Sequence, residues 1–480
     1  MLARKTLGKL SLLVFAVGAS SPLTVLIGGL PTMYSTGVTG IPMSYLLVGA
    51  LFLVVAVGYV AMARHIHHPA PFYALLSHGL GPLPGVSGAG VALLGYNAIQ
   101  ISLYGLVGTR LARVVGAGPW WAWAALAWVA VAVLGRFRGA DNARVLGGLL
   151  VIELGVILSF DITAFTHPAP GASLGLAPLT PGSLAVPGAA GVVAFAMASL
   201  TGAETPPVFG EEARGPRTVA VSTFTAVGGL GILYAVTAWA YAVNVGQDNF
   251  AAAAQDPDGP FSLITRIWGV DITPLADVLL VTSVLTALSA FHSTVARYVF
   301  SMAREGVLPQ YLGTVTAGAR GGTPLRGSLV QSGIAGLTIA GFAAAGADPM
   351  ATMFVWLSTI GAVSILFLLT ATSVAALAWF HRGGGTNESA IVRQGLPGVG
   401  ALVGVAVLLV TLTNLSVMLG TAPGSILPWL VVGIIVLSGA AGLVWGLTVR
   451  ARNPQVYEAA GRHIPDSIMT RDPRLSQIKL

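Results

Sequence analysis

The sequence predicts an all-α polytopic membrane protein with twelve transmembrane helices. Of its 480 residues, 55% are hydrophobic and only 9% are charged, which leaves too little polar surface to cover a water-soluble globule of this size. Twelve apolar stretches each approach the roughly 20 residues that a helix needs to span a bilayer. They cover residues 11–36, 41–63, 88–112, 119–135, 145–165, 188–208, 218–243, 274–301, 328–346, 350–380, 397–418 and 426–449. The first stretch is too long for a cleavable signal peptide and is expected to remain as a helix.

Positive charges mark alternate ends of these stretches. Most of the 24 Lys and Arg residues lie at every second junction, beginning with Lys5 and Lys9, and only Arg110, Arg113 and Arg266 fall toward the other side. The positive-inside rule therefore predicts that both termini are cytoplasmic, which agrees with an even number of spans. The net charge of +7 is explained by membrane topology and not by a nucleic-acid-binding patch.

Composition and motifs exclude several classes of protein. The chain contains no cysteine, so disulfides, thiol catalysis and Cys-ligated metals are excluded. It contains no Gly-x-x-x-x-Gly-Lys-Ser/Thr loop, so ATP is not expected to drive it directly. No His-Glu-x-x-His or similar catalytic spacing occurs, which argues against an intramembrane enzyme.

Little of the chain lies outside the predicted spans. The loops 166–187 and 244–273 and the tail 451–480 are too short to bury cores of their own, which disfavours a membrane sensor with a signalling domain. Residues 1–450 are expected to form one transmembrane domain. His65, His67 and His68 could bind a metal, but a hydrated basic flank is the favoured interpretation, and no metal or cofactor is predicted.

The first span is interrupted near its middle. Pro22 lacks a backbone donor, and the glycine and serines before it favour non-helical backbone. On its own, such an interruption is as often a simple kink as a binding site. The interrupting residues are Gly18, Ala19, Ser20, Ser21 and Pro22.

The sixth span carries a matching interruption. Two breaks five spans apart are expected in a transporter built from two inverted five-helix repeats, here 11–165 and 188–380, with trailing helices over 397–449. Unwound backbone is tolerated at the membrane midplane only where protein or a water-filled cavity satisfies it. The half-helix ends at such breaks attract ions or zwitterions. The residues of the second interruption are Ser199, Thr201, Gly202, Glu204, Pro206 and Pro207.

Three segments resemble the amino acid-polyamine-organocation superfamily of permeases. Residues 209–217, Phe-Gly-Glu-Glu-Ala-Arg-Gly-Pro-Arg, and residues 297–309, Arg-Tyr-Val-Phe-Ser-Met-Ala-Arg-Glu-Gly-Val-Leu-Pro, are similar to that family's cytoplasmic junctions. Residues 72–81 are similar to its re-entrant helix between spans 2 and 3. The resemblance implies the five-plus-five inverted-repeat fold, with substrate lying between spans 1, 3, 6, 8 and 10.

The sequence departs from this family at the expected substrate site. Members commonly carry a Gly-x-Gly turn in the first span whose amides take an amino acid's carboxylate, whereas residues 19–22 here are Ala-Ser-Ser-Pro. Bulky side chains are common near Ala198 and Ala203, where this chain has alanine. These departures predict a larger pocket and a bulky or unusual substrate.

Glu153 lies near the centre of the fifth span with apolar residues on both sides. A charged carboxylate at this depth costs roughly 3 kcal/mol, so the acid should be protonated, paired or on a water-filled path. In related proton-coupled permeases this stretch can hold a Lys that touches the unwound part of the first span, and Glu153 resembles that position. We expect Glu153 to carry a coupling proton.

Glu204 and His292 are the other predicted proton-coupling residues. Glu204 follows the break in the sixth span and matches the acid of the family's Gly-Phe-Glu segment. An imidazole can exchange protons near neutral pH, and the face of the eighth span that carries His292 with Ser289 and Ser293 is expected to approach the first break. Hydrogen bonding to unwound backbone by Glu204, and packing by His292, are the alternatives.

A polar face in the third span completes the predicted site. Asn97, Gln100 and Tyr104 are spaced to share one helix face, which is typical of a cavity lining and equally of packing between helices. Asp161 and Asp277 are expected to be interfacial, and Glu211, Glu212, Arg214 and Arg304 could form ion pairs that close a cytoplasmic gate. The predicted substrate-binding residues are Gly18, Ala19, Ser20, Ser21, Asn97, Gln100, Tyr104, Ala198, Ser199, Thr201, Gly202 and Ala203.

The sequence therefore predicts a secondary-active permease of the cell inner membrane. We expect uptake of an amino acid or related amine by alternating access, with H+ as the coupling ion and membrane lipid as the solvent. The main alternative is an obligate exchanger of amino acids, amines or polyamines, which the two midplane acids and the missing glycine turn favour.

Overall fold

The computed structural model of the chain describes residues 5–137, 139–172, 174–253, 256, 259–316, 322–386, 388–422 and 424–462, and within these ranges it is built of helices without strands. Ten helical segments there are long and apolar enough to cross a membrane. Two shorter apolar helices, α7 (Trp120–Leu134) and α9 (Ala189–Ser199), lie where the sequence predicts the fourth and sixth spans.

The first long segment is a composite of four pieces. It runs through α1 (Lys9–Ser20), α2 (Pro22–Thr24), the π-helix η1 (Val25–Gly29) and α3 (Leu30–Tyr34). The other long helices are α4 (Ile41–Ala63), α6 (Pro82–Val115), α8 (Gly139–Thr166), α10 (Pro216–Val245), α13 (Thr273–Arg304), α14 (Leu325–Ala344), α15 (Val355–His381, preceded by the π-helix Pro349–Phe354), α16 (Leu396–Thr413, preceded by the π-helix Ile391–Gly395) and α18 (Leu427–Arg452).

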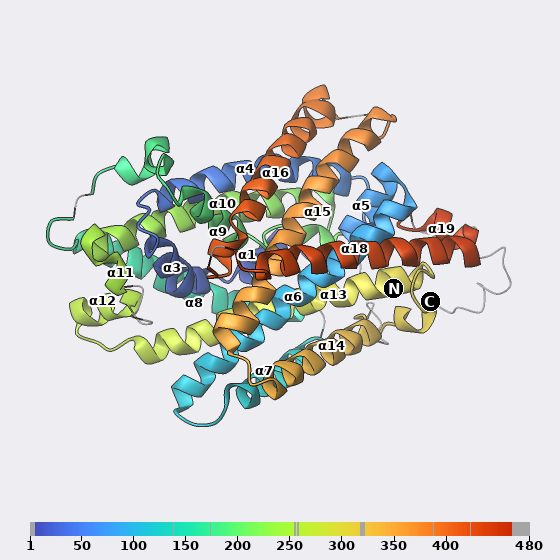
Figure 1. Cartoon of the computed structure of the whole chain (residues 1–480). Helices are drawn as coiled ribbons and strands as arrows, with labels where there is room; N and C mark the ends of the chain where they lie inside the picture. Colours follow the sequence, from blue (N-terminus) through green and yellow to red (C-terminus); the bar gives the residue numbers. More distant parts are fainter. Residues whose placement is uncertain are drawn as a thin grey trace.

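Short helices lie at the two ends of the bundle (Figure 1). One end carries α3, α11 (Phe250–Ala253) and α12 (Gly259–Trp268). The opposite end carries α5 (Pro71–Leu80) and α19 (Pro454–Ala459). We call this second end the terminal end, because the first and last described residues, Lys5 and Arg462, line one hollow there.

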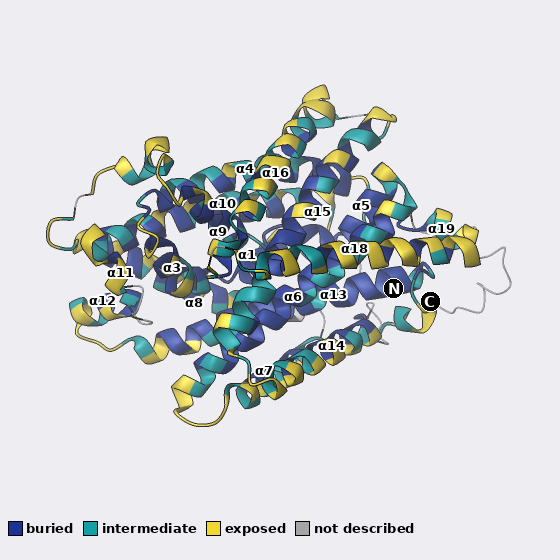
Figure 2. Cartoon of the chain, viewed as in Figure 1, coloured by how far each residue is buried: buried dark blue, intermediate teal, exposed yellow. Residues whose placement is uncertain are grey.

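Burial separates central helices from peripheral ones. In Figure 2, α1, α6 and α13 are largely buried, whereas the outer faces of α14, α16 and α18 are exposed. In the most apolar window of each span, 78% of the α15 segment is buried but only 22% of α18. The exposed faces of α18 carry Trp429, Leu437 and Val444, which is expected where lipid is the solvent. The central helices are therefore those that meet around the two predicted breaks.

Several helix bounds differ from the sequence prediction, among them the start of the third span and the end of the sixth. The third span begins at Pro82, earlier than residue 88, because prolines are tolerated in a first turn whose N–H groups have no helical partner. The sixth span is α-helical only to Ser199, and a 3₁₀ turn, η4 (Pro206–Phe209), follows the interruption. The unwound stretch between them positions the candidate site.

Candidate functional site

The break in the first span centres on one residue. Ser21 separates α1 from α2 with a φ of 45°, a left-handed conformation that is unfavourable for residues other than glycine. Pro22 follows and cannot donate a backbone hydrogen bond. The carbonyl of Ser20 accepts a hydrogen bond from the Tyr234 hydroxyl at 3.5 Å. Other helices thus satisfy backbone groups that the break removes from α1.

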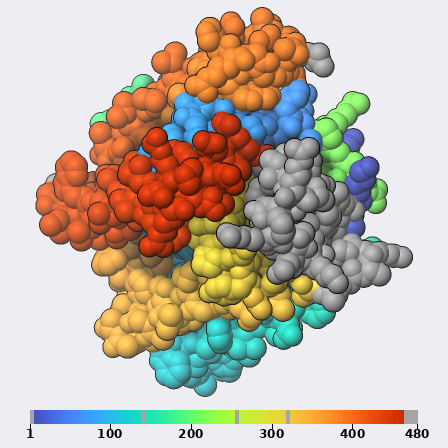
Figure 3. Space-filling model, turned by 90° about the vertical axis from the view of Figure 1, so that its right-hand side faces the viewer, coloured from blue at the N-terminus to red at the C-terminus, as the bar shows by residue number. Residues whose placement is uncertain are grey.

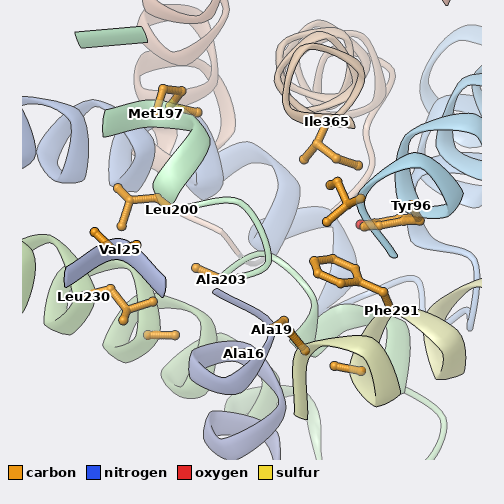
Figure 4. Close-up of a cluster of buried hydrophobic side chains, with 14 of the residues drawn as sticks. Ala16, Ala19, Val25, Tyr96, Met197, Leu200, Ala203, Leu230, Phe291 and Ile365 are labelled. Carbon is orange, nitrogen blue, oxygen red and sulfur yellow. The ribbon is translucent and has the colours of Figure 1, made fainter. Parts of the chain in front are cut away.

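The break in the sixth span lies directly against the first. Gly202 has a φ of 109°, and a Cβ placed on it would lie 2.8 Å from the Cβ of Ala19. The Ser20 hydroxyl donates to the carbonyl of Thr201 at 3.3 Å. Figure 4 shows Ala19 and Ala203 within one cluster that also contains Tyr96 and Phe291. The two interruptions therefore form a single region.

Glu153 of α8 joins this region from the side. Its Oε1 accepts from the backbone N–H of Leu23 at 2.8 Å and from the Ser283 hydroxyl at 2.7 Å. Ser283 Oγ also lies 2.8 Å from Ser21 Oγ. Glu153 is 3% exposed, so a buried carboxyl group links the first break to α8 and α13.

A chain of hydroxyl groups leads away from Glu153. Ser283 has one hydroxyl proton and gives it to Glu153, so Ser21 must donate to Ser283. The Ser21 oxygen lies 2.7 Å from the hydroxyl of the half-buried Thr24, which by the same count donates to Ser21. Thr24, Ser21, Ser283 and Glu153 thus form an ordered series of donors and acceptors.

Glu204 stabilises the second break from within. Its Oε2 accepts from the backbone N–H of Gly202 at 2.7 Å, and its Oε1 accepts from the Tyr96 hydroxyl at 3.3 Å. The Tyr59 hydroxyl donates to its main-chain carbonyl at 3.3 Å. Glu204 is fully buried, and both of its carboxyl oxygens are hydrogen-bonded.

His292 does not approach the first break, so the expected orientation of its helix face is wrong. Its Nε2 lies 2.7 Å from the Ser328 hydroxyl of α14, and its Nδ1 lies 3.4 Å from the amide of Gln100. The α13 residue that hydrogen-bonds to the break is Ser283. Nine residues make about two and a half helical turns, which points His292 to the opposite side of α13.

Gln100 and Tyr104 belong to this second polar cluster. The Gln100 amide donates to Tyr104 at 3.3 Å, and Gln331 of α14 donates to the Gln100 side-chain oxygen. Asn97 donates to the carbonyl of Leu93 at 2.7 Å. The structure therefore divides the predicted polar residues between a break region and a cluster on α6, α13 and α14.

The small residues of the predicted site allow close packing. A Cβ on Gly18 would lie 2.4 Å from Thr286 Cγ2, so α1 and α13 meet at this glycine. Ala203 is fully buried and Ala198 is half-buried. Ser199 donates to the carbonyl of Phe195 at 3.0 Å and also lies 3.2 Å from the Tyr45 hydroxyl.

Sequence reasoning missed several groups at the breaks, among them Ser283, Tyr96 and the amide of Leu23. Ser283 and Thr286 are spaced to share one face of their helix, and this polar spacing could have identified them. The resemblance implies that Glu153 lies near the unwound part of the first span, but no sequence pattern marks the amide of Leu23 as its partner.

Asp161 and Asp277, which the sequence predicts to be interfacial, are buried within the bundle. Asp277 pairs with Arg110 and Arg113 of α6. Asp161 accepts a hydrogen bond from the Thr237 hydroxyl at 3.1 Å and is 3% exposed. Neither contacts the break residues through a hydrogen bond in the described part of the chain.

Ion pairs join the helices at the terminal end. Arg297 of α13 binds Glu212 at 2.7 Å, and both side chains are buried. Arg297 also covers the ring of Phe209, which stacks on Phe15 of α1 with ring centres 4.5 Å apart. Glu211 binds Arg304 at 2.8 Å. Of the predicted gate residues, Arg214 contributes a backbone N–H, which donates to the carbonyl of Leu7 at 3.0 Å.

A second contact at this end encloses Glu305. This carboxylate accepts from His68 Nε2 at 2.9 Å, the Tyr73 hydroxyl at 2.7 Å and the backbone N–H of Gly461 at 2.7 Å. The N–H of Ala70 donates to His68 Nδ1, so Nε2 carries the proton that bonds to Glu305. Figure 3 shows the C-terminal helices α18 and α19 beside the end of α13 at this face.

The geometry defines a class of protein: a helical membrane protein with two abutting helix breaks and buried carboxyl groups beside them. The sequence matches the amino acid permease family over residues 11–451, and the chain therefore belongs to that family. No curated protein matches it.

A solved structure shares the fold. It is that of a manganese transporter from Eremococcus coleocola, in complex with an aromatic bis-isothiourea substituted compound. The TM-score is 0.57 at 14% sequence identity, and the match covers 92% of this chain and 95% of that one. The family and this shared fold identify the chain as a membrane transporter.

Proposed function

We propose that the chain is a secondary-active permease that imports an amino acid or related amine together with a proton carried by Glu153. In this proposal it spans the inner membrane twelve times, with both termini cytoplasmic. Two inverted five-helix repeats, 11–165 and 188–380, alternate access to a substrate site at the breaks, and helices over 397–449 follow. The terminal end is then the cytoplasmic end.

The contact between Glu153 and the amide of Leu23 is the observation that carries this proposal. Hydrogen bonds to an ionised carboxylate are about twice as strong as neutral ones. Protonation of Glu153 therefore weakens its hold on Leu23 and Ser283, and frees the first span to move against α8 and α13. Such a change couples the charge of one side chain to the position of the helix that borders the substrate site.

The hydroxyl series supplies a route for the proton. The last hydrogen bond of the series runs from the Ser283 hydroxyl to Oε1 of Glu153, so a proton passed along the series reaches Glu153 at Oε1. Each hydroxyl from Thr24 through Ser21 to Ser283 can accept one proton while it donates another. In the proposed cycle, protons enter at Thr24 and reach Glu153 along this series.

The contacts at the terminal end act as the inward gate in this proposal. Arg297 with Glu212, and Phe15 with Phe209, lie along the chain between the breaks and the terminal end. Substrate release to that side requires these contacts to separate. The arrangement described above then corresponds to the stage of the cycle in which the gate is closed.

An exchanger of amines or polyamines is the second candidate. It is favoured because Glu153 already occupies the Leu23 amide at the first break, which leaves this N–H unavailable to a substrate carboxylate. Counterflow in proteoliposomes without a pH gradient would favour exchange, if it is as fast as uptake in the presence of the gradient.

Identification of the substrate comes first. Purified protein is screened by thermal unfolding against amino acids, amines and polyamines, because a ligand that binds only the folded state raises its apparent stability. The strongest stabilising compound then serves as the transported probe.

The coupling role is tested with Glu153→Gln, which keeps an oxygen for the Leu23 amide but cannot carry the proton. We expect loss of accumulation driven by a pH gradient, with counterflow retained. Asp161→Asn is the matched control, because it neutralises another buried acid of α8 that accepts a hydroxyl hydrogen bond. Accumulation by Glu153→Gln with an unchanged pH dependence would contradict the proposal.

A further inference from the structure

A hollow of about 520 Å³ opens at the terminal end, away from the helix breaks. Four segments that are distant in sequence form it: the residues before α1, the turn after α4, the link between η4 and α10, and the segment after α19, with α5 at its side. The lining side chains that matter here are Lys5, His67, His78, Glu211, Arg214 and Arg462.

The charge of this lining is strongly positive. Lys5, Arg214 and Arg462 supply three fixed positive charges. The one carboxylate among the lining residues, Glu211, already binds two guanidinium nitrogens of Arg304, at 2.8 and 3.2 Å. A concave surface with this excess attracts anions.

Two imidazoles in the hollow have lowered pKa values, chiefly because they are partly buried. Burial lowers the pKa of His78, and the nearby Arg462 lowers it further. Burial and then His65 lower the pKa of His67. Negative charge in the hollow would oppose these effects, so both rings could take up protons and become additional donors to an anion.

A metal ion is a poorer occupant of this hollow. His65 lies 3.1 Å from Glu388 and His68 lies 2.9 Å from Glu305, so two of the lining histidines are engaged by carboxylates. The described residues contain no group of three His, Cys, Asp or Glu side chains arranged to hold a metal. The fixed positive charges oppose a cation as well.

The hollow is separate from the site at the breaks. Along the first span the order is Lys5, Phe15 and then Ser21. Along the sixth span and the link that follows, Gly202 is followed by Phe209 and then by Arg214. The stack of Phe15 on Phe209 thus lies between the breaks and the hollow on both segments.

We propose that this hollow binds a phosphate-bearing anion and that the bound anion keeps the terminal end closed. Arginine side chains bind phosphate oxygens in pairs, and lysine adds a point charge. The N-terminus of α10 contributes Gly215 and Pro216 to the same lining, and helix N-termini favour phosphate groups. The phosphate belongs either to a soluble ester or to a lipid headgroup.

The bound anion would keep the terminal end closed because it would bridge segments that already contact one another. The N–H of Leu7 donates to the carbonyl of Glu212, and the N–H of Arg214 donates to the carbonyl of Leu7. Gly461 donates to Glu305 of the link after α13. An anion held by Lys5, Arg214 and Arg462 adds a further contact among segments that must separate for the terminal end to open.

The test measures binding without any transported substrate. Pyrophosphate is titrated into protein purified without phosphate, and thermal unfolding is followed in nanodiscs of phosphatidylcholine alone or with phosphatidylglycerol. The double variant Arg214→Gln, Arg462→Gln removes two charges from the hollow. Arg217→Gln is the matched control, because it removes an exposed charge at the start of α10 that does not line the hollow.

We expect pyrophosphate to stabilise the wild type and Arg217→Gln, with its Kd weakened at least about tenfold in the double variant. Hydrogen exchange of residues 456–462 should slow when the anion binds. If phosphatidylglycerol alone stabilises, with the same dependence on Arg214 and Arg462, the source is a lipid headgroup and the site stands. No stabilisation by either probe, or equal stabilisation of the double variant, would overturn the proposal whether or not the chain transports with a proton.

Discussion

The two helix breaks lie against each other but are stabilised in different ways. The first depends on distant side chains: Glu153 of α8 binds Leu23, and Ser283 of α13 contacts both Glu153 and Ser21. The shortest contact at the second is local, because Glu204 binds the amide of Gly202 only two residues earlier at 2.7 Å, and the contacts from Tyr96 and Tyr59 are longer at 3.3 Å. The first break therefore connects three helices, whereas the carboxylate at the second mainly fixes a local backbone shape.

Because of this difference, substitutions of the two buried acids Glu153 and Glu204 should have different effects. A change at Glu153 alters how the first span is attached to its neighbours, and so should affect coupling more than stability. A change at Glu204 alters a backbone conformation, and so should affect stability more than coupling.

The largest expected effect on stability is that of Gly202→Ala. The new Cβ would lie 2.8 Å from Ala19 Cβ and 2.9 Å from its carbonyl carbon, at a φ of 109°. Strain and overpacking together should lower the free energy of unfolding by about 2 to 4 kcal/mol. Denaturant unfolding checks this against Gly28→Ala, whose Cβ meets nothing within 4 Å. Equal stability of the two variants would mean that the breaks do not pack as described.

Glu204→Leu should have the next largest effect. It leaves the N–H of Gly202 without its partner, which costs about 1 to 3 kcal/mol in a buried site. Glu204→Gln keeps an acceptor for that N–H and should retain both stability and proton-driven uptake. Thermal unfolding and uptake under a pH gradient, measured on both variants, test the contrast with Glu153. If a stable Glu204→Gln variant lost proton-driven uptake, the coupling role would belong to Glu204 at the second break and not to Glu153 at the first.

Ser283→Ala should have the smallest of the three effects. It removes one of the two donors to Glu153 and breaks the hydroxyl series, while the contact with Leu23 remains. A loss of about 1 kcal/mol corresponds to roughly a fivefold slower proton-driven uptake. Ser289→Ala is the matched control, because the buried Ser289 hydroxyl has no hydrogen-bond partner among the described residues. Equal rates for the two variants would remove Ser283 from the proton route.

The apolar helices and the position of both breaks could be predicted because their signals are local. Apolar runs identify the helices, and Pro22 and Gly202 interrupt them wherever the fold places them. The rotation of one helix against another is not local, which is why the sequence pointed His292 toward the first break although it faces α6 and α14. The Glu305 contact brings together His68 and Gly461, and no sequence pattern connects residues so far apart.

Hydrogen exchange at the amide of Leu23 tests the proposed role of Glu153 without requiring a known substrate. Exchange is measured at pH values on both sides of neutrality for the wild type and Glu153→Gln, and is corrected for the intrinsic pH dependence of amide exchange. We predict that protection of Leu23 in the wild type falls as the pH falls, because protonation weakens the Glu153 hydrogen bond, and that Glu153→Gln shows weaker protection that does not vary with pH. Protection that is independent of pH in the wild type, or that varies equally in both proteins, would contradict the account.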